Sequence, residues 1–420
     1  MPKDKWEGLV PKRACYAQDY TGLKILHTLY DSCLKAEIDF LDDHYLLNLI
    51  VDEGCIKGAI FLDSHTGEII QINAKAVVLA TGGYGGIYHG YTTNSYGSTG
   101  DGIAVVLRAG GAVSDLEFVQ FHPTALKRSS ILMSESARGE GGYLVNSEGE
   151  RFIDELKPRD EVARAIFRQE QEGKEVFLDV RHLGEEKLMH LLPQEVALCK
   201  LHEHIDPAKA LIPIKPVAHY SMGGIEVNSS LEVQGIQGCF AVGECANAKV
   251  HGANRLGGNS LLEITSLGRF AGDHAHQYTR SASNKEANST QRDKDQKAIE
   301  AIYAQACTLN FYEKQQALGK LMYEKVGIQR ENTQLLQAME EVRAMQEMKE
   351  QMGIADKSPI HNQNLIEYLE FSSALLLAPM IISSALARNE SRGAHYKIGF
   401  EKQDDKHFAK HHIIQWKREI

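Results

Sequence analysis

The sequence predicts an α/β fold, in which a Rossmann-like domain with a parallel sheet and a β-meander is interrupted by an α+β insertion and followed by helices. Two strands carry this prediction, at 76–80 (AVVLA) and 238–244 (GCFAVGE). Both are apolar on both faces, as strands buried in a parallel sheet are. The long stretch between them mixes helical and strand patterns, and we expect it to form a capping domain over the sheet.

Size and composition narrow the class of protein. With 420 residues, 43% of them hydrophobic, the chain is long enough for several domains with cores of their own. The net charge of −10 argues against nucleic acid as a partner, because phosphate binding requires a basic face. Seven cysteines without a C-x-x-C pair indicate neither a zinc site nor a disulfide framework, and no metal is expected.

The first predicted elements form a meander. Short strands at 46–51, 55–62 and 68–73 are separated by turn residues and lead into the buried strand at 76–80. That strand ends in Thr81-Gly82-Gly83, and a glycine pair at the carboxyl end of a strand is where α/β sheets bind ligands.

The second buried strand ends in a carboxylate, Glu244. Acids in this position commonly bind the hydroxyls of a ribose or ribitol chain. The alternative is that Glu244 only caps a helix, but the small residues around it favour contact with a ligand.

The segment 251–263 (HGANRLGGNSLLE) places one cation, Arg255, among glycines that allow a ligand to approach the backbone. The helix that begins near Ser260 has free N–H groups that favour a negatively polarised atom. The segment therefore predicts an anion and flavin site, although alone it is also compatible with an ordinary turn before a capped helix.

The insertion carries paired charges that suggest proton transfer. If Glu135 lies between Arg138 and Arg159, the three could pass a proton, but only in a buried, charge-crowded site. A surface turn and an ordinary helix start are the alternatives. His122 and His219 stand at the two junctions between the sheet and the insertion, where together with Arg255 they would surround a small dianion. A lone histidine beside aromatic residues is otherwise usually a core residue.

The rest of the chain is predicted to be mainly helical. We expect helices within 298–350 and 362–389, a polar linker or loop at 277–297, and a core helix rather than a membrane span at 374–387. No G-x-S-x-G elbow or H-E-x-x-H spacing indicates a hydrolase or a metal site. The predicted divisions are 1–120 and 217–276 for the sheet domain, 121–216 for the insertion, 277–395 for the helices and 396–420 for a tail.

Taken together, these strings resemble the flavoprotein subunit of the succinate dehydrogenase and fumarate reductase family, with L-aspartate oxidase as a close cousin. Seven motifs in the family's order carry the resemblance across nearly the whole chain: ATGG, FVQFHPT, SARGEGG, PRDEVAR, HYSMGG, AVGE and HGANRLGGNSL. The resemblance implies an FAD-binding domain, and FAD as the cofactor.

The resemblance also assigns roles by position. Arg159 resembles the active-site proton donor, and Glu135 and Arg138 resemble its proton relay. The groups that resemble the dicarboxylate ligands are His122, Ser134, His219 and Arg255, with Ser134 standing where the family usually has threonine. Expected flavin contacts are Thr81, Gly82, Gly83, Asp101, Glu244, Ser260 and Leu261.

The implied activity is the interconversion of fumarate and succinate by hydride transfer at the flavin. Implied partners are an iron–sulfur subunit and, through it, a quinone-reactive membrane anchor, which would make the chain a peripheral subunit on the cytoplasmic face of the inner membrane. An L-aspartate oxidase is the rival of the same fold, disfavoured by Met222 and by the tail from Glu390. A non-catalytic dicarboxylate-binding or assembly module is the rival of another class.

One part of the family pattern is missing. Family members begin with a strand, a G-x-G-x-x-G turn and a helix that hold the flavin pyrophosphate, whereas the glycines at 82–86 do not have this spacing. We therefore expect a chain that lacks the opening βαβ unit, on the order of 100 residues, and binds FAD weakly or not at all alone.

Overall fold

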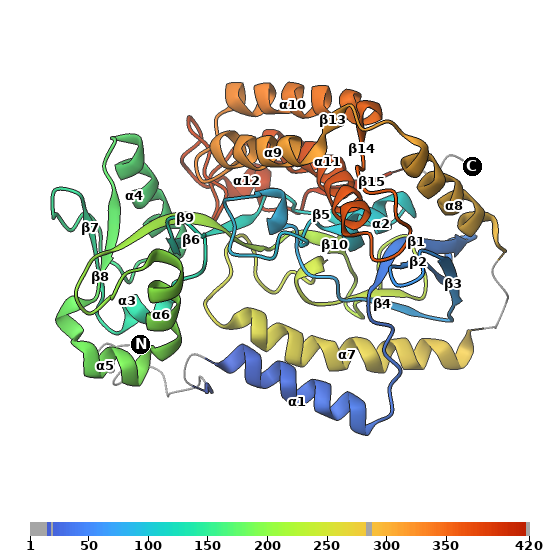
Figure 1. The fold of residues 1–420 in the computed structure, drawn as a ribbon, viewed down its shortest axis with the longest axis horizontal. Coiled ribbons are helices and arrows are strands. Elements are labelled where there is room, and N and C mark those ends of the chain that lie inside the picture. Colours follow the sequence, from blue (N-terminus) through green and yellow to red (C-terminus); the bar gives the residue numbers. More distant parts are fainter. Residues whose placement is uncertain (1–14, 18–19, 283–287, 417–420) are drawn as a thin grey trace. The chain divides into compact units, whose positions relative to one another are not determined.

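The computed structural model describes residues 15–17, 20–282 and 288–416. The chain forms two compact units (Figure 1). The insertion unit comprises Phe121–Val217 together with the described residues up to Leu41, and the sheet unit comprises Asp42–Gln120 and the described residues from Ala218 onward. The unit boundaries fall within two strands, at residues 120/121 and 217/218.

The predicted meander is present in the sheet unit. β1 (His44–Asp52), β2 (Cys55–Asp63) and β3 (Ile69–Asn73) form an antiparallel sheet in that order. Glu53 and Gly54 make the tight turn between the first two strands, both with positive φ.

The two strands that the sequence predicted for a parallel sheet are present, and they pair with each other. β4 (Val77–Leu79) pairs in parallel with β11 (Cys239–Ala241), with Val77 opposite Cys239. Among the described residues this parallel sheet has two strands, and Val78 is 42% exposed. The glycine turn after β4 leads into a short 3₁₀ helix (Gly85–Ile87) rather than directly into a long helix. The next helix, α2 (Asp101–Arg108), buries its whole middle.

A second sheet of this unit has the order β12-β10-β5-β15. Its strands are β12 (Ala246–Asn247), β10 (Gly224–Glu226), β5 (Ala112–Ser114) and β15 (Ile413–Gln415). β15 runs antiparallel to β5, so the segment that the sequence suggested as a tail contributes an edge strand, preceded by the short helix α12 (Asp405–Phe408).

The insertion has the expected α+β character. Its sheet has the order β6-β9-β8-β7, built from β6 (Val119–Leu126), β9 (Ile212–Ser221), β8 (Val176–Asp179) and β7 (Tyr143–Asn146). Its helices are α3 (Glu135–Gly139), α4 (Arg159–Gln171), α5 (Glu185–Leu191) and α6 (Pro193–Leu198). The apolar side of α4 joins a core that includes Leu144, Ile166 and Leu178.

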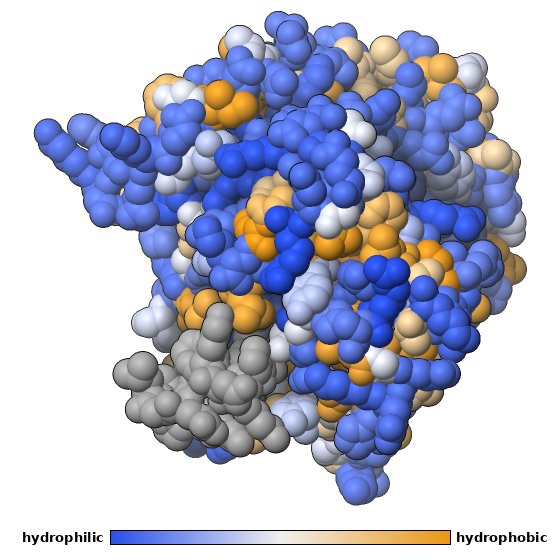
Figure 2. Space-filling model, turned by 90° about the vertical axis from the view of Figure 1, so that its left-hand side faces the viewer, coloured by the Kyte–Doolittle hydropathy of each residue, from blue (hydrophilic) through white to orange (hydrophobic). Residues whose placement is uncertain are grey.

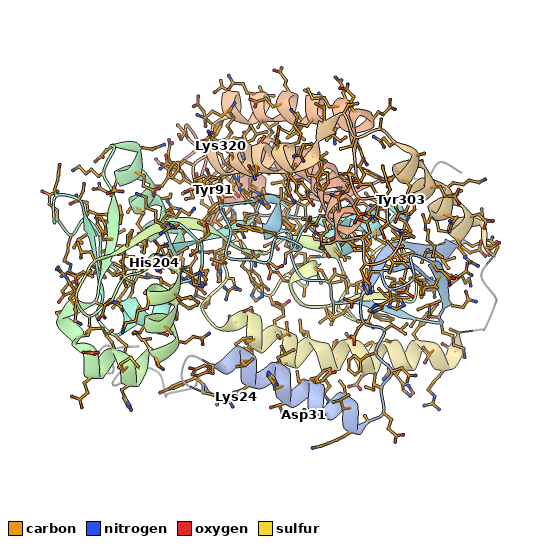
Figure 3. The ribbon with its side chains drawn as sticks, in the orientation of Figure 1. Lys24, Asp31, Tyr91, His204, Tyr303 and Lys320 are labelled. Carbon is orange, nitrogen blue, oxygen red and sulfur yellow. The ribbon has the colours of Figure 1, made fainter. Side chains whose placement is uncertain are left out.

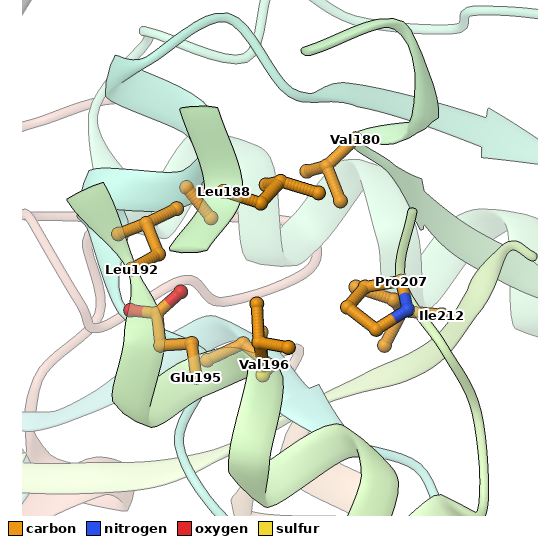
Figure 4. Close-up of a pocket in the computed structure, with 9 residues that line it drawn as sticks. Val180, Leu188, Leu192, Glu195, Val196, Pro207 and Ile212 are labelled. Carbon is orange, nitrogen blue, oxygen red and sulfur yellow. The ribbon is translucent and has the colours of Figure 1, made fainter. Parts of the chain in front are cut away.

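That core encloses a small cavity lined mainly by apolar side chains, among them Leu188, Leu192 and Val196 (Figure 4). Its volume of about 10 Å³ is at the lower limit for a single water molecule. The cavity is therefore a packing defect of the core rather than a ligand site.

Helix α1 (Thr21–Lys35) has no buried residue. Lys24 and Asp31 mark it in Figure 3. Several of its large apolar side chains are exposed, including Leu23, Leu26 and Leu34. Elsewhere the surface is largely hydrophilic with scattered apolar patches, as one face shows (Figure 2).

The remaining helices belong to the sheet unit. They are α7 (Asn259–Ser281), α8 (Thr290–Ala304), α9 (Phe311–Val326), α10 (Asn332–Glu347) and α11 (Gln363–Ala387), with a small parallel pair, β13 (Leu309–Asn310) and β14 (Met352–Gly353). The last three helices pack against one another. Tyr91, which is labelled in Figure 3, stacks on Tyr323 of α9 with 4.3 Å between the ring centroids.

The prediction of a polar linker at 277–297 was wrong for most of its length. Residues 277–281 complete α7 and 290–297 belong to α8, while 283–287 lie outside the described residues. The polar composition misled because α8 exposes most of its charged side chains and buries little besides Asp295 and Ile299.

Helix α11 is long and apolar enough to cross a membrane by composition alone. Its central residues are buried against the neighbouring helices, however, including Leu375, Leu377 and Ile381. The expectation of a core helix at 374–387 is confirmed.

Glu370 on α11 gives a stability prediction. Burial raises its pKa to about 7, assisted by the charges of Asp101 and Glu367. The folded state therefore holds a proton that the unfolded state releases near the ordinary value of 4.5, so stability falls as pH rises from 4.5 to 7. We expect Glu370→Gln to stabilise the protein at pH 8 by about 1 to 2 kcal/mol, a figure reduced for partial solvent access.

Urea unfolding at pH 8 and pH 5 measures this effect. The gain should shrink to a small fraction at pH 5, close to the ordinary pKa, and Glu340→Gln, at an exposed position on α10, should change neither value. An equal gain at both pH values would show that the carboxylate charge is not the cause.

Candidate active site

The insertion unit pairs two of the predicted catalytic residues. Arg159, the first residue of α4, donates from Nη2 and Nε to a single oxygen of Glu135, Oε2, at 2.6 and 3.1 Å. Glu135 is the first residue of α3. The Arg159 side chain is 10% exposed and that of Glu135 is 46% exposed, so the pair has a buried cationic end and a solvent-accessible anionic end.

Arg138 is buried, which excludes the surface-turn alternative for this residue. Its Nη1 donates to the carbonyl oxygen of Glu155 at 2.6 Å, whereas its Nε and Nη2 have no hydrogen-bond partner among the described residues. Burial lowers the pKa of Arg138 and the nearby charge of Glu135 opposes that shift. Glu135 is thus close to both arginines, but its ion pair is with Arg159.

The residues around Ser134 are held by two hydrogen bonds from other elements. Thr124 of β6 donates its hydroxyl to the Met133 carbonyl at 2.8 Å, and the Ser134 N–H donates to Glu195 Oε1 at 3.1 Å. The Ser134 hydroxyl itself caps α3, accepting from the Ser136 N–H. This local role was not predicted, although serine at the start of a helix commonly plays it.

His122 lies in β6 and is 1% exposed. The backbone nitrogen and the carbonyl oxygen of Thr124 both lie 3.2 Å from His122 Nδ1, so these contacts are compatible with either neutral tautomer. The tautomer with its proton on Nε2 would present an N–H donor of the kind that binds a carboxylate.

The sheet unit holds the other two predicted dicarboxylate ligands. Arg255 is 5% exposed, and its Nη2 donates to Gln120 Oε1 at 3.3 Å. Gln120 in turn donates to the Arg255 carbonyl at 2.7 Å, so it fixes both ends of that residue. His219 Nδ1 lies 2.8 Å from the hydroxyl of Thr93.

The predicted cofactor residues gather at the carboxyl ends of β4 and β11. Glu244 Oε1 accepts from the backbone N–H and hydroxyl of Ser221 at 2.9 and 3.0 Å, and burial raises the pKa of this carboxyl. A Cβ at Gly83 would lie 2.3 Å from Glu244 Oε1 and 2.2 Å from the Ser221 hydroxyl, so a larger residue there would displace these two side chains. Thr81 at the end of β4 is exposed.

Two glycines leave the backbone open to a ligand in this region. Gly82 and Gly258 both have positive φ, and a Cβ on either would meet nothing within 4 Å. Gly258 precedes α7, whose first turn contains Ser260 and Leu261, so free N–H groups of a long helix face outward there. These features fit the ring end of a flavin.

Asp101, another expected flavin contact, is at the start of α2. Its two carboxylate oxygens accept from the hydroxyls of Tyr45 and Thr99, at 2.7 and 2.9 Å. Among the described residues no group of three histidine, cysteine or acidic side chains is arranged to hold a metal ion.

Sequence reasoning missed the residues that support Arg255. Tyr220, His251 and Glu263 form a hydrogen-bonded cluster beside it, and Gln120 clamps it. All four lie within or directly beside the motifs already quoted, but nothing in their spacing indicated that their side chains meet.

Comparison with known proteins identifies the family of the chain. Residues 6–261 match the FAD binding domain family, and residues 315–420 match the fumarate reductase flavoprotein C-terminal family. The chain is 37% identical over 438 residues to the fumarate reductase flavoprotein subunit of Escherichia coli strain K12, which covers 97% of this chain and 72% of that protein. The chain belongs to the succinate dehydrogenase and fumarate reductase flavoprotein family. It is therefore a member of a family of FAD-dependent oxidoreductases.

Two further relatives support membership of this family. The succinate dehydrogenase flavoprotein subunit of Coxiella burnetii is 37% identical over 436 residues, 96% of this chain and 73% of that protein. A solved structure of E. coli quinol fumarate reductase superposes with a TM-score of 0.92 at 37% identity, covering 96% of this chain and 74% of that one. The fold of the flavoprotein, with its FAD-binding and C-terminal parts, is thus confirmed.

Proposed function

We propose that this flavoprotein interconverts fumarate and succinate, with Arg159 as the proton donor to carbon. The observation that carries the proposal is the ion pair between Arg159 and Glu135 at the starts of two helices, next to the buried Arg138. The geometry suits proton delivery, since the Arg159 side chain is only 10% exposed and Glu135 Oε2, at 2.6 Å from Nη2, can restore a proton that Arg159 gives up.

His122, Ser134, His219 and Arg255 are the proposed dicarboxylate ligands. Cationic and N–H donors on both carboxylates would orient the alkene and stabilise the negative charge that develops during the reaction. Bound FAD supplies the hydride that the other alkene carbon receives. Its ring would lie at Gly82, Gly83 and the start of α7, with Glu244 near the ribitol hydroxyls.

In the reductive direction Arg159 gives its proton to the carbon that does not receive the hydride. The exposed Glu135 carboxylate then takes up a proton from solvent and passes it to the neutral Arg159, which regains its positive charge. Arg138 makes no hydrogen bond to the Glu135 carboxylate in the described structure. It stabilises the ionised form of Glu135 through its charge alone. The sequence of transfers leaves each residue in its starting state.

The proposed partners are an iron–sulfur subunit and, through it, a quinone-reactive membrane anchor, with the chain as a peripheral subunit on the cytoplasmic face of the inner membrane. Support comes from relatives named as subunits of fumarate reductases, and from a solved relative named as a quinol-fumarate reductase with menaquinol molecules, 36% identical with a TM-score of 0.91.

Steady-state turnover tests the proposed activity against its rival. The FAD-loaded protein, purified with any polypeptide that accompanies it, is assayed anaerobically with a reduced dye and fumarate, and separately with L-aspartate and oxygen. We expect fumarate reduction and no oxidation of aspartate. Oxidation of aspartate without oxidation of succinate would instead identify an L-aspartate oxidase, and dicarboxylate binding without either turnover would indicate the non-catalytic module.

A further inference from the structure

Three buried side chains of the sheet unit form a closed cluster beside Arg255. The Tyr220 hydroxyl donates to Glu263 Oε2 at 2.9 Å, and His251 Nε2 lies 2.6 Å from the same oxygen. The Tyr220 hydroxyl and His251 Nε2 are 3.2 Å apart, and the two rings meet edge to face at 86°. Each of the three side chains is therefore fixed by the other two.

The cluster is well shielded from solvent. Tyr220 is 5% exposed, and the side chains of His251 and Glu263 are 7% and 2% exposed. Burial and the Glu263 carboxylate both raise the pKa of Tyr220, so its hydroxyl keeps its proton and remains a donor. The three residues come from β9, the loop before α7, and α7 itself, so the cluster also ties these elements together.

The face of the Tyr220 ring contacts the guanidinium of Arg255. The guanidinium carbon of Arg255 lies 4.4 Å from the centroid of that ring, within the range of a cation–π contact. Such a contact is strongest where water is excluded, and both side chains are almost fully buried. The face of an aromatic ring holds a guanidinium in place without neutralising its charge.

We propose that Tyr220, His251 and Glu263 are positioning residues for Arg255, holding its guanidinium in the orientation in which it binds one carboxylate of a dicarboxylate. This inference rests on the proposed function of Arg255 and deepens it. Glu263 is the centre of the arrangement, because it fixes the plane of the Tyr220 ring through the hydroxyl and is itself held by His251.

The arrangement predicts different results for two changes at one position. Tyr220→Phe keeps the ring face and loses only the contacts of the hydroxyl with Glu263 and His251, whereas Tyr220→Leu removes the ring face altogether. We expect the affinity for malonate, a dicarboxylate that is not turned over, to fall about threefold in Tyr220→Phe and about tenfold in Tyr220→Leu, the latter equal to about 1.4 kcal/mol.

Isothermal titration of the FAD-loaded protein with malonate measures these affinities. A double-mutant cycle separates positioning from general destabilisation: in an Arg255→Ala background, Tyr220→Leu should cause no further loss. In steady state the KM for fumarate should rise while kcat changes less than about twofold. Tyr278→Leu is the control. Tyr278 lies on α7, its ring packs on Phe240, and the variant should bind malonate normally.

Malonate affinity unchanged in Tyr220→Leu, or equal losses with and without Arg255, would overturn the positioning role while leaving the proposed function intact. Wild-type protein that neither binds malonate nor reduces fumarate would overturn both. If Tyr220→Leu does not fold, Tyr220→Phe and Glu263→Gln decide the question, since both keep side-chain volume; each should weaken binding about threefold, and wild-type affinity in both would reject the proposal.

Discussion

Replacing Arg159 by alanine is expected to lower kcat for fumarate reduction by about 10⁴-fold, the upper end of what a positioned general acid contributes. The loss should fall on kcat, because Arg159 is bonded to Glu135 and acts on a carbon rather than anchoring a carboxylate. Lysine should recover little activity, since an ammonium cannot reproduce the two N–H bonds to Glu135 Oε2.

The measurement is dye-coupled fumarate reduction, with flavin content read from the visible spectrum and malonate affinity from titration. Both should stay near wild-type values in Arg159→Ala. Arg181 offers a matched control, since it also makes a two-bond ion pair within the insertion unit, with Asp179. Arg181→Ala should keep full activity, and comparable turnover in the two variants would exclude Arg159 as the proton donor.

The second large effect is expected for Glu135→Gln. The amide keeps the size of the side chain but removes the charge that pairs with Arg159 and the capacity to carry a proton. We expect kcat to fall by about 10² to 10³-fold while KM changes little, within the range for loss of a proton-transfer group.

A solvent isotope effect gives a second reading of the same variant. With proton return to Arg159 impaired, turnover in D₂O should slow more in Glu135→Gln than in wild type. Glu175→Gln is the control, because Glu175 is also an exposed carboxylate of the insertion unit with a cationic partner, Lys127. A variant Glu135→Gln with wild-type turnover and isotope effect would remove Glu135 from the proton route.

The sequence was sufficient for the meander and for assigning β4 and β11 to a parallel sheet, because an apolar run ending in glycine or in an acid has few other structural uses. It did not predict that these two strands pair with each other. It failed at 277–297, where polar composition suggested a linker. Charged residues can equally occupy the solvated faces of helices, as they do in α8.

The sequence proposed members for the candidate site but did not predict the side chains with which they form hydrogen bonds. The sequence suggested Glu135 between two arginines, and the structure gives Arg159 as its ion-pair partner while Arg138 bonds the carbonyl of Glu155. The contact of Arg255 with the face of the Tyr220 ring depends on a ring orientation that Glu263 sets from α7. Such geometry arises only when distant segments fold together, so no local pattern reports it.

Reoxidation of the reduced flavin by fumarate tests the central claim most directly. The FAD-loaded protein is reduced anaerobically and mixed with fumarate in a stopped-flow instrument, with the flavin absorbance followed in time and succinate measured at the end. The account predicts rapid reoxidation in wild type, one succinate formed for each flavin reoxidised, and a rate about 10⁴-fold lower in Arg159→Ala. A flavin that stays reduced in the presence of saturating fumarate, in protein that binds malonate, would contradict it.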